Sequence, residues 1–177
     1  IIIPTYNSGD VINECLEKIY GQNYPFFEVI IVDNYSSDDT VKKAKKFKVK
    51  MKIIQQKCNP ALARNIGVIN SKGKYVLFLD SDQAVSQNLI GECVKKCEKD
   101  ETGMIIIPEV YVGKNFWACC SAAWKNCYSE TEKNCDDNWH IETYRPRFFL
   151  KEHIIRVGMF NSTLLWGEDC DLYNRLK

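Results

Sequence analysis

The sequence predicts an α/β fold in which a mostly parallel sheet is covered by helices on both faces. Short runs rich in Val and Ile, such as "FEVIIVD" (27–33) and "KYVLFLD" (74–80), are typical of buried strands. Between them lie segments with apolar residues at helical spacing, such as "DVINECLEKIY" (10–20). Strands that alternate with amphipathic helices indicate a parallel sheet with helices on its faces.

The remaining elements follow from the same patterns. "SSDDTVKKAKKF" begins with residues that cap helices and continues with a lysine-rich face, whereas "GMIIIPEV" is a branched apolar run. We expect strands at 1–4, 27–33, 51–56, 74–80 and 103–110, and helices at 10–20, 36–47, 61–71 and 88–99. The last third is less regular: we expect a helix at 115–129, a turn-rich loop at 132–147, a short strand and helix within 148–160, and a helix within 166–177.

Length and composition indicate a globular domain. The 177 residues are enough for one domain with a substantial core. The chain is 45% hydrophobic and 27% charged with a net charge of +1, so charge gives no indication of nucleic-acid binding. No apolar run approaches the roughly 20 residues of a membrane-spanning helix, and no signal peptide is evident. The chain starts without Met and stops within a helical pattern, so we expect a domain truncated at both ends, with flanking membrane or targeting segments left open.

The cysteines and the lysine-rich run can each be interpreted in more than one way. The nine cysteines are interpreted mainly as ordinary thiols, with one or two disulfides or a metal site as alternatives. Their odd number, without a secretory signal, favours a reduced, cytosolic protein. The lysine-rich run from Lys42 to Lys52 is interpreted as a solvated helix face, with contact to an anionic membrane surface as the alternative.

The stretch "YVLFLDSDQ" ends a predicted strand with two aspartates, Asp80 and Asp82. Two carboxylates this close disfavour each other's charged form, so a positive partner between them is expected. Alternate residues at a strand end project to the same side, and Mg²⁺ or Mn²⁺ accepts carboxylate oxygens together with substrate phosphates. No dinucleotide-binding or P-loop glycine pattern is present to hold phosphates instead. The alternative is a pair of loop aspartates that cap the next helix.

Other polar residues also follow predicted strands, where open parallel sheets bind their ligands. Four motifs occur in this order: "IPTYN", "VIIVDNYSSDDT", "ALARNIGVINSKGKYVLFLDSD" and "GEDCDLYNRL". Together they resemble the family-2 glycosyltransferases of the GT-A fold, which use nucleotide-sugar donors and act with inversion. The resemblance covers nearly the whole chain. It implies a single GT-A (Rossmann-like) domain over 1–177, with a nucleotide-sugar-binding half at 1–108 and an acceptor-side half at 109–177.

The resemblance also implies roles for individual residues. Asp82, with Asp80, is expected to hold Mn²⁺ or Mg²⁺. Asp169 is expected to be the catalytic base beside Glu168, because a sugar hydroxyl must lose its proton as it attacks. The residues expected to bind the nucleotide sugar are Pro4, Thr5, Tyr6, Asn7, Asp33, Asn34, Arg64 and Asp80.

Two departures from the family pattern affect the site. Many members have Asp where this chain has Asn34, and an amide can donate as well as accept, so preference for a UDP-sugar over a GDP-sugar stays open. Some relatives supply a third metal ligand, for which Gln83, His140 and His153 are the candidates here. A single His is more often structural than a ligand.

The acceptor side is expected within 109–147, where large aromatics can stack on a sugar, lie against lipid or pack in a core: Trp117, Trp124, Trp139 and Tyr144. The expected partners are a nucleotide-sugar donor and a saccharide or lipid-linked acceptor, with no nucleic acid. We expect a cytoplasmic location with peripheral contact at the cytoplasmic face of a membrane. Two other functions stay open, a non-catalytic nucleotide-sugar-binding module and a sugar nucleotidyltransferase. The latter usually has a basic, glycine-rich loop near its first strand, but "PTYNSGD" has no basic residue.

Overall fold

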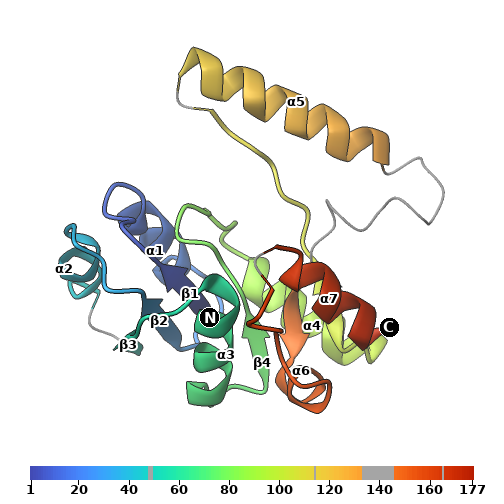
Figure 1. The fold of residues 1–177 in the computed structure, drawn as a ribbon. Helices are drawn as coiled ribbons and strands as arrows, with labels where there is room; N and C mark the ends of the chain where they lie inside the picture. The colour runs from blue at the N-terminus through green and yellow to red at the C-terminus, as the bar shows by residue number, and fades with distance from the viewer. Residues whose placement is uncertain (48–49, 114, 133–145, 165) are drawn as a thin grey trace.

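Strands and helices alternate through most of the chain (Figure 1). The structure, a computed structural model, describes residues 1–47, 50–113, 115–132, 146–164 and 166–177. The elements are β1 (Ile2–Thr5), α1 (Ile12–Tyr20), β2 (Val29–Asp33), α2 (Thr40–Ala44), β3 (Met51–Gln55), α3 (Pro60–Asn70), β4 (Tyr75–Leu77), α4 (Leu89–Asp100), β5 (Met104–Ile106), α5 (Phe116–Glu132), β6 (Pro146–Leu150), α6 (Lys151–Arg156) and α7 (Glu168–Leu176).

The described strands form two three-stranded sheets that join through β1 and the end of β4. In the first sheet β2 lies between β1 and β3, and all three strands are parallel. In the second, β6 lies between β4 and β5 and is antiparallel to both. A parallel bridge between Ile2 and Phe78, with a 3.1 Å hydrogen bond from Leu79 N to Ile2 O, connects the sheets. The predicted α/β fold with a mostly parallel sheet is confirmed, and β6 is the antiparallel exception among the described strands.

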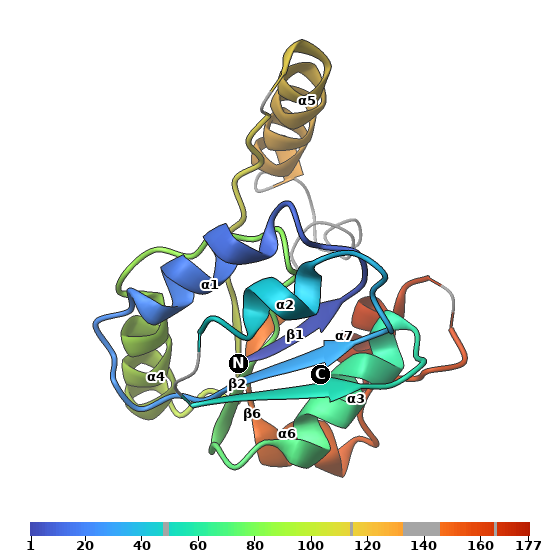
Figure 2. The same ribbon diagram turned by 90° about the vertical axis from the view of Figure 1, so that its left-hand side faces the viewer.

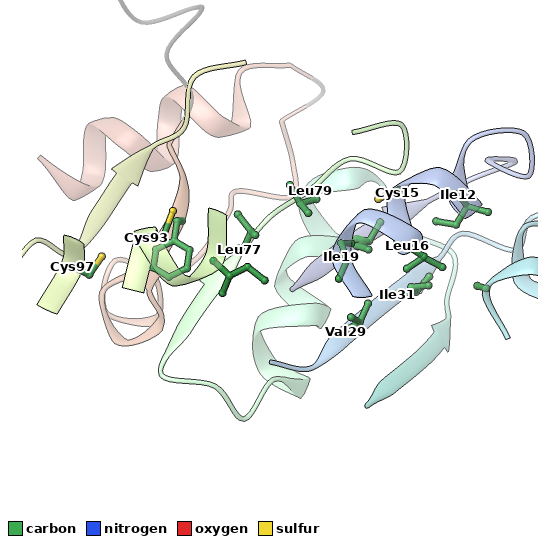
Figure 3. Close-up of a cluster of buried hydrophobic side chains, with 14 residues drawn as sticks. Ile12, Cys15, Leu16, Ile19, Val29, Ile31, Leu77, Leu79, Cys93 and Cys97 are labelled. Atoms are coloured by element: carbon green, nitrogen blue, oxygen red, sulfur yellow. The ribbon is translucent and has the colours of Figure 1, made fainter. Parts of the chain in front are cut away.

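Apolar side chains cover both faces of the sheet because neighbouring strand residues point to opposite sides. Ile3, Leu77 and Phe148 belong to a cluster with α1 and α4, part of which Figure 3 shows around Leu16, Ile19 and Cys93. Their neighbours face the cluster on the other side, with α3, α6 and α7: Ile2, Val76, Phe78 and Phe149. Figure 2 shows α1 and α2 on one side of β1, β2 and β3 and α3 on the other. Such two-sided burial explains why the strand segments are continuously apolar.

Close packing of α3 on β1 depends on Gly67. A Cβ atom there would come within 2.3 Å of Ile2 Cγ2, which is far inside normal contact distance. The helix therefore approaches the central strand more closely than any other residue would permit. This contact fixes α3, which carries Arg64, against the sheet.

Several elements differ from their predicted bounds, among them α2, which covers Thr40–Ala44 instead of 36–47. β4 ends at Leu77 rather than 80, and the next residue, Phe78, forms a bridge with Ile2 of β1 while Leu79 N donates to Ile2 O. β5 covers Met104–Ile106 instead of 103–110, and β6 starts at Pro146 inside the segment expected to be a loop. α5 extends away from the rest of the domain in both views (Figures 1 and 2). Among the described helices, none is both long and apolar enough to cross a membrane.

Candidate active site

The first half of the site forms where β1 and β2 end. Asp33, the last residue of β2, is fully buried and accepts hydrogen bonds from Thr5 Oγ1 (3.2 Å), Ser36 N (3.0 Å) and Gln55 Nε2 (3.0 Å). Both of its carboxylate oxygens are thus used within the protein. In this arrangement Asp33 shapes the turn that follows β2, and any influence on a bound nucleobase passes through its neighbours Thr5 and Ser36.

Exposed groups surround this buried carboxylate. Tyr6, directly after β1, is 62% exposed, and Tyr35 after β2 is equally exposed. Both rings are free to provide flat surfaces for a base to stack on. Asn7 lies between the two loops: it has a positive φ of 47°, and its Oδ1 accepts from Ser37 N at 2.9 Å. Pro4 lies within β1 and pairs with Val32.

Asn34 has a defined orientation. Its Oδ1 accepts a hydrogen bond from Cys58 N (3.0 Å), and its backbone N donates to Thr5 O (2.9 Å). With the oxygen engaged, the side-chain NH₂ is the group left for a ligand. The sequence suggested an amide that turns either way, but Cys58 fixes it as a donor.

The second half of the site is a cluster of charged side chains that we call the central ion-pair cluster. Arg64 on α3 is 5% exposed and lies among three carboxylates. Its Nη2 is 3.2 Å from Asp80 Oδ1, and its Nη1 is 2.9 Å from Glu168 Oε1 and 3.5 Å from Asp169 Oδ1. The guanidinium also lies 5.5 Å from the Phe160 ring centroid. Arg64 therefore connects the residue at the end of β4 to the two acidic residues that begin α7.

A second buried arginine completes the central ion-pair cluster. Arg147, also 5% exposed, places Nη2 3.1 Å from Asp80 Oδ2 and Nε 2.9 Å from Glu109 Oε1. The full cluster is Arg64, Asp80, Glu109, Arg147, Glu168 and Asp169. Two guanidinium charges face four carboxylate charges, which leaves a formal net charge of −2 before Asp82 is added. A buried site with surplus negative charge is suited to a cation.

The beginning of α7 explains why Glu168 and Asp169 point to this cluster. Gly167 precedes the helix with φ 78°, a left-handed conformation that turns the chain sharply into α7. Carboxylates in the first turn of a helix are stabilised by its dipole. Both side chains are mostly buried, at 19% and 14% exposure, and both contact Arg64. The two expected catalytic residues are therefore adjacent to the expected nucleotide-binding arginine.

Asp82 differs from Asp80. It is exposed and, within the described part of the chain, makes no ion pair or side-chain hydrogen bond. Its neighbour Ser81 donates to Ser8 Oγ at 2.8 Å, which anchors the turn to the loop after β1. An exposed carboxylate beside partly exposed Asp80 matches the oxygen ligands of Mg²⁺ or Mn²⁺, which also bind substrate phosphates. No group of three or more His, Cys, Asp or Glu among the described residues has the arrangement of a metal site. The protein thus offers one or two carboxylates, as Mg²⁺ sites with phosphate ligands usually do.

The candidate third ligands lie elsewhere. His153 is on α6, which follows β6 and so lies at the opposite edge of the sheet from Asp80; there its ring packs against Gly103. His153 is therefore not placed to be the third ligand, and its packing against Gly103 agrees with the structural role favoured for a single His. Gln83 is close to the site, but its Oε1 accepts from Asp80 N (2.9 Å) and its Nε2 donates to Glu109 Oε1 (3.0 Å). His140 lies outside the described residues.

Cys15 lies beneath the same turn, with its Sγ 3.8 Å from Asp80 O. Burial, together with the negative charges of Asp82, Asp80 and Glu14, raises the pKa of the thiol to about 12. Cys15 is therefore a neutral core residue, in agreement with the interpretation of the cysteines as ordinary thiols. Cys58, Cys93, Cys97, Cys119 and Cys120 are also free thiols.

Three residues of the site were missed in the sequence: Glu109, Arg147 and Asn65. Asn65 exchanges two hydrogen bonds with the backbone of Phe160, from Nδ2 to O at 2.8 Å and from N to Oδ1 at 2.9 Å. This pairing holds the loop before α7 against α3. Asn65 belongs to the Ala-Arg-Asn motif, which was a usable signal. Glu109 and Arg147 become neighbours through the antiparallel position of β6, which no local pattern revealed.

Most of the described part of the expected acceptor segment is exposed, apart from Ala122 and the two ends, Glu109 and Arg147. Trp117 and Trp124 on α5 are exposed, as are Val110 and Val112 before it. A core role for these two tryptophans is wrong for this structure. Trp139 and Tyr144 lie outside the described residues.

The α/β sheet thus gathers acidic residues and two buried arginines near the carboxyl ends of β1, β2 and β4. The sequence matches the family model "Glycosyl transferase family 2" over residues 1–158, so the chain belongs to glycosyl transferase family 2. The predicted family and the GT-A fold are thereby confirmed.

Individual relatives agree with this family. The chain is 35% identical over 166 residues to the poly(ribitol-phosphate) beta-glucosyltransferase of Bacillus spizizenii, covering 88% of this chain and 25% of the relative. It is 31% identical over 194 residues to the minor teichoic acid biosynthesis protein GgaA of Bacillus subtilis, covering 99% of this chain and 42% of GgaA. The chain thus spans less than half of the length of these relatives.

Solved structures share the fold. S. aureus TarS 1-349 in complex with UDP-GlcNAc has a TM-score of 0.76 at 21% identity, covering 99% of this chain and 52% of that one. The mannosyltransferase PcManGT from Pyrobaculum calidifontis, in complex with GDP-Man and Mn²⁺, has a TM-score of 0.72 at 20% identity, covering 99% and 50%.

Proposed function

We propose that this chain transfers a sugar from a nucleoside-diphosphate sugar to an acceptor hydroxyl, with inversion at the anomeric carbon and with help from Mn²⁺ or Mg²⁺. The observation that carries the proposal is the bridge formed by Arg64. It joins Asp80, at the expected donor site, to Glu168 and Asp169 at the expected acceptor site. Donor and acceptor groups that meet at one buried charge are suited to a single direct transfer.

The donor is proposed to lie along the carboxyl edge of β1, β2 and β4. Tyr6 offers a stacking surface for the base, the NH₂ of Asn34 offers a hydrogen-bond donor, and Asp80 faces the ribose and sugar side. Pro4, Thr5, Asn7 and Asp33 shape the two turns around the base. Asp82, with Asp80, would hold the divalent ion. When bound, such an ion stabilises negative charge on the departing diphosphate.

Asp169 is proposed to accept the proton of the acceptor hydroxyl. A positioned general base contributes roughly 10²–10⁴-fold to such a step. Asp169 lies in the first turn of α7, and its Oδ1 is 3.5 Å from Arg64 Nη1. Glu168, more tightly bound to Arg64 at 2.9 Å, is proposed to orient the sugar rather than to take a proton. With the base opposite the leaving diphosphate, a single displacement gives inversion.

The acceptor is proposed to be a saccharide or a lipid-linked saccharide that binds beside α7. The same proposal divides the single domain into a donor half, 1–108, and an acceptor half, 109–177. The exposed tryptophans of α5 support an acceptor with apolar sugar faces or lipid, and peripheral contact with the cytoplasmic face of a membrane belongs to this proposal. A non-catalytic binding module is less favoured, because both acidic residues of α7 are retained and point into the site.

The first experiment measures the shift in melting temperature with UDP, GDP, CDP and dTDP, each with Mn²⁺ and with EDTA. A ligand that binds only the folded state stabilises it by mass action. The structures that hold UDP-GlcNAc or GDP-Man with Mn²⁺ make UDP and GDP the expected ligands. The matching nucleotide sugar is then tested for transfer. Stabilisation by none of the four diphosphates overturns the donor assignment, and stabilisation without any turnover favours the binding module.

A further inference from the structure

Four residues around Asp80 form a closed ring of hydrogen bonds, which we call the Asp80 ring. Arg147 Nη2 donates to Asp80 Oδ2 (3.1 Å), and Arg147 Nε donates to Glu109 Oε1 (2.9 Å). Gln83 Nε2 donates to the same Glu109 oxygen (3.0 Å), and Asp80 N donates to Gln83 Oε1 (2.9 Å). The ring therefore holds Asp80 by its carboxylate and by its backbone at once.

The ring joins three separate parts of the fold. Asp80 and Gln83 lie in the turn after β4, Glu109 lies three residues after β5 ends, and Arg147 is the second residue of β6. β6 runs antiparallel between β4 and β5, so its first residues lie at the edge where those two strands end. The Phe78 N to Arg147 O hydrogen bond of 2.9 Å attaches Arg147 directly to the chain that leads into Asp80.

Burial and its carboxylate partners hold Arg147 in this position. Its side chain is 6% exposed, and removing the carboxylate partners of a buried guanidinium strongly destabilises the folded protein. Two N–H groups of one planar fork reach two different carboxylates, a geometry that the single ammonium of lysine does not reproduce.

The two oxygens of Asp80 are divided between two arginines. Arg64 takes Oδ1 and Arg147 takes Oδ2, so the plane of the carboxylate is fixed before any donor arrives. Arg64 also contacts Glu168 at the start of α7, whereas Arg147, within the described part of the chain, donates side-chain hydrogen bonds to Asp80 and Glu109. The two arginines therefore have separable tasks.

We infer that Arg147 is a positioning residue for donor binding: it sets the orientation of Asp80 toward the sugar end of the nucleotide sugar, and Glu109 in turn orients Arg147. The inference rests on the proposed function, because Asp80 must face the donor for its orientation to matter. The inference predicts different effects on two ligands: the intact nucleotide sugar and the nucleoside diphosphate that remains after transfer. Under the proposed function the base lies against Tyr6 and Asn34, and the exposed Asp82 supplies the main carboxylate for the ion at the diphosphate. Loss of the ring is therefore expected to weaken mainly the contact of Asp80 with the part of the donor beyond the diphosphate.

The test compares Arg147→Lys, Arg147→Gln and Glu109→Gln with wild type. Calorimetric titration in Mn²⁺ measures affinity for UDP and UDP-GlcNAc, and for GDP and GDP-mannose. For the pair that wild type binds, each variant should bind the nucleotide sugar about 10–100-fold more weakly, the range typical of residues that orient a ligating carboxylate. Affinity for the nucleoside diphosphate should stay near wild type. A residue needed only for folding would weaken both ligands together.

Two further measurements sharpen the result. Arg156→Gln is the matched control, since Arg156 is an exposed arginine at the end of α6, on the opposite edge of the sheet. Glu109→Gln keeps an acceptor oxygen for Arg147 and Gln83, so it tests the ring even if Arg147→Gln does not fold. Because Arg147 and Glu109 act through one ring, Glu109→Gln added to Arg147→Lys should weaken donor binding by less than the product of the single effects.

The outcomes distinguish the two proposals. If wild type binds a nucleotide sugar and the variants bind it equally well, Arg147 does not position Asp80 and the inference is overturned alone. Equal weakening of nucleotide sugar and diphosphate also overturns it, because the effect is then not confined to the sugar end. If wild type binds no nucleotide sugar at all, the proposed function fails and the inference fails with it.

Discussion

Arg64 on α3 and Glu168 at the start of α7 lie 104 positions apart in the sequence, and their side chains are joined by a 2.9 Å hydrogen bond from Nη1 to Oε1. The same guanidinium reaches Asp80 with its other terminal nitrogen. One buried side chain thus sets the separation between the end of β4 and the beginning of α7. Several measurable properties depend on this contact.

Removing the Arg64 charge should lower both stability and transfer. In Arg64→Gln, three carboxylates lose their shared counter-charge, and breaking a buried pair in this way costs about 3–5 kcal/mol as an upper bound. Arg64→Lys keeps the charge but not the fork, so it should recover most of the stability and little of the transfer. Urea unfolding and initial rates measure the two effects. Wild-type rates in Arg64→Lys would show that the fork is not needed.

Asp82→Asn should abolish the benefit of Mn²⁺ for nucleotide binding. Asp82 is the exposed carboxylate of the turn, and replacing it with an amide removes a charged oxygen ligand. Titration of the nucleoside diphosphate with Mn²⁺ and with EDTA should show a difference in wild type and none in the variant. Asp100→Asn, on the surface of α4, is the control and should behave as wild type. Equal binding by wild type in EDTA would contradict a role for metal.

Asp169→Asn should separate catalysis from donor binding. The amide keeps the size of the side chain but cannot accept the acceptor's proton, so transfer should fall by roughly 10²–10⁴-fold. Affinity for diphosphate and metal should change little, and Glu168→Gln should be milder. Asp171→Asn is the matched control, because Asp171 is on the same helix and pairs with Arg175 outside the site. A dead Glu168→Gln beside an active Asp169→Asn would assign the base to Glu168.

Asn34→Asp should sharpen the preference for UDP. The Oδ1 of Asn34 is held by Cys58 N, which leaves its NH₂ to donate toward the base. A carboxylate at this position presents an acceptor instead, which matches the N3–H of uracil. The ratio of UDP to CDP affinity should therefore rise in the variant, since cytosine N3 is an acceptor. An unchanged ratio means that residue 34 does not contact the base.

Cys15 should make stability depend on pH in the alkaline range. Its pKa is raised from 9.0 to about 12 in the folded protein, so only the unfolded chain ionises as the pH first passes 9. The contribution of Cys15 is therefore complete below pH 9 and is lost progressively as the pH rises toward 12. Urea midpoints between pH 7 and 10.5 should fall more steeply in wild type than in Cys15→Ala. If the urea midpoints of wild type and Cys15→Ala fall equally with pH, the thiol of Cys15 has the same pKa in the folded and unfolded states.

The parts of the fold predictable from sequence are those governed by local pattern. The strand before Asp33 and the helix that carries Arg64 have clear periodicity and end signals, and both lie where expected. The turn with Asp80 and Asp82 was recognisable because it follows an apolar strand. Those residues needed only the rule that parallel strands present their carboxyl ends at one edge.

Other parts depended on long-range contacts. The direction of β6 follows from its pairing with β4 and β5, and the polar segment before it gave no sign of a strand. Arg147 in "RPRFF" has the appearance of a solvated loop residue, and only the antiparallel register brings it to Asp80 and Glu109. The fixed orientation of Asn34 likewise depends on the backbone of Cys58, 24 positions away.

The bond between Glu109 and Arg147 spans 38 positions, and α5 lies within that span. This bond joins the two ends of the segment that contains α5. The entropy of closing a loop grows only slowly with its length, by about 0.6 kcal/mol per doubling. The segment between Glu109 and Arg147 can therefore be lengthened, shortened or exchanged with little change in the free energy of folding of the donor site. If the proposed division into donor and acceptor halves holds, a different segment grafted between Glu109 and Arg147 should change acceptor specificity and leave the donor site unchanged.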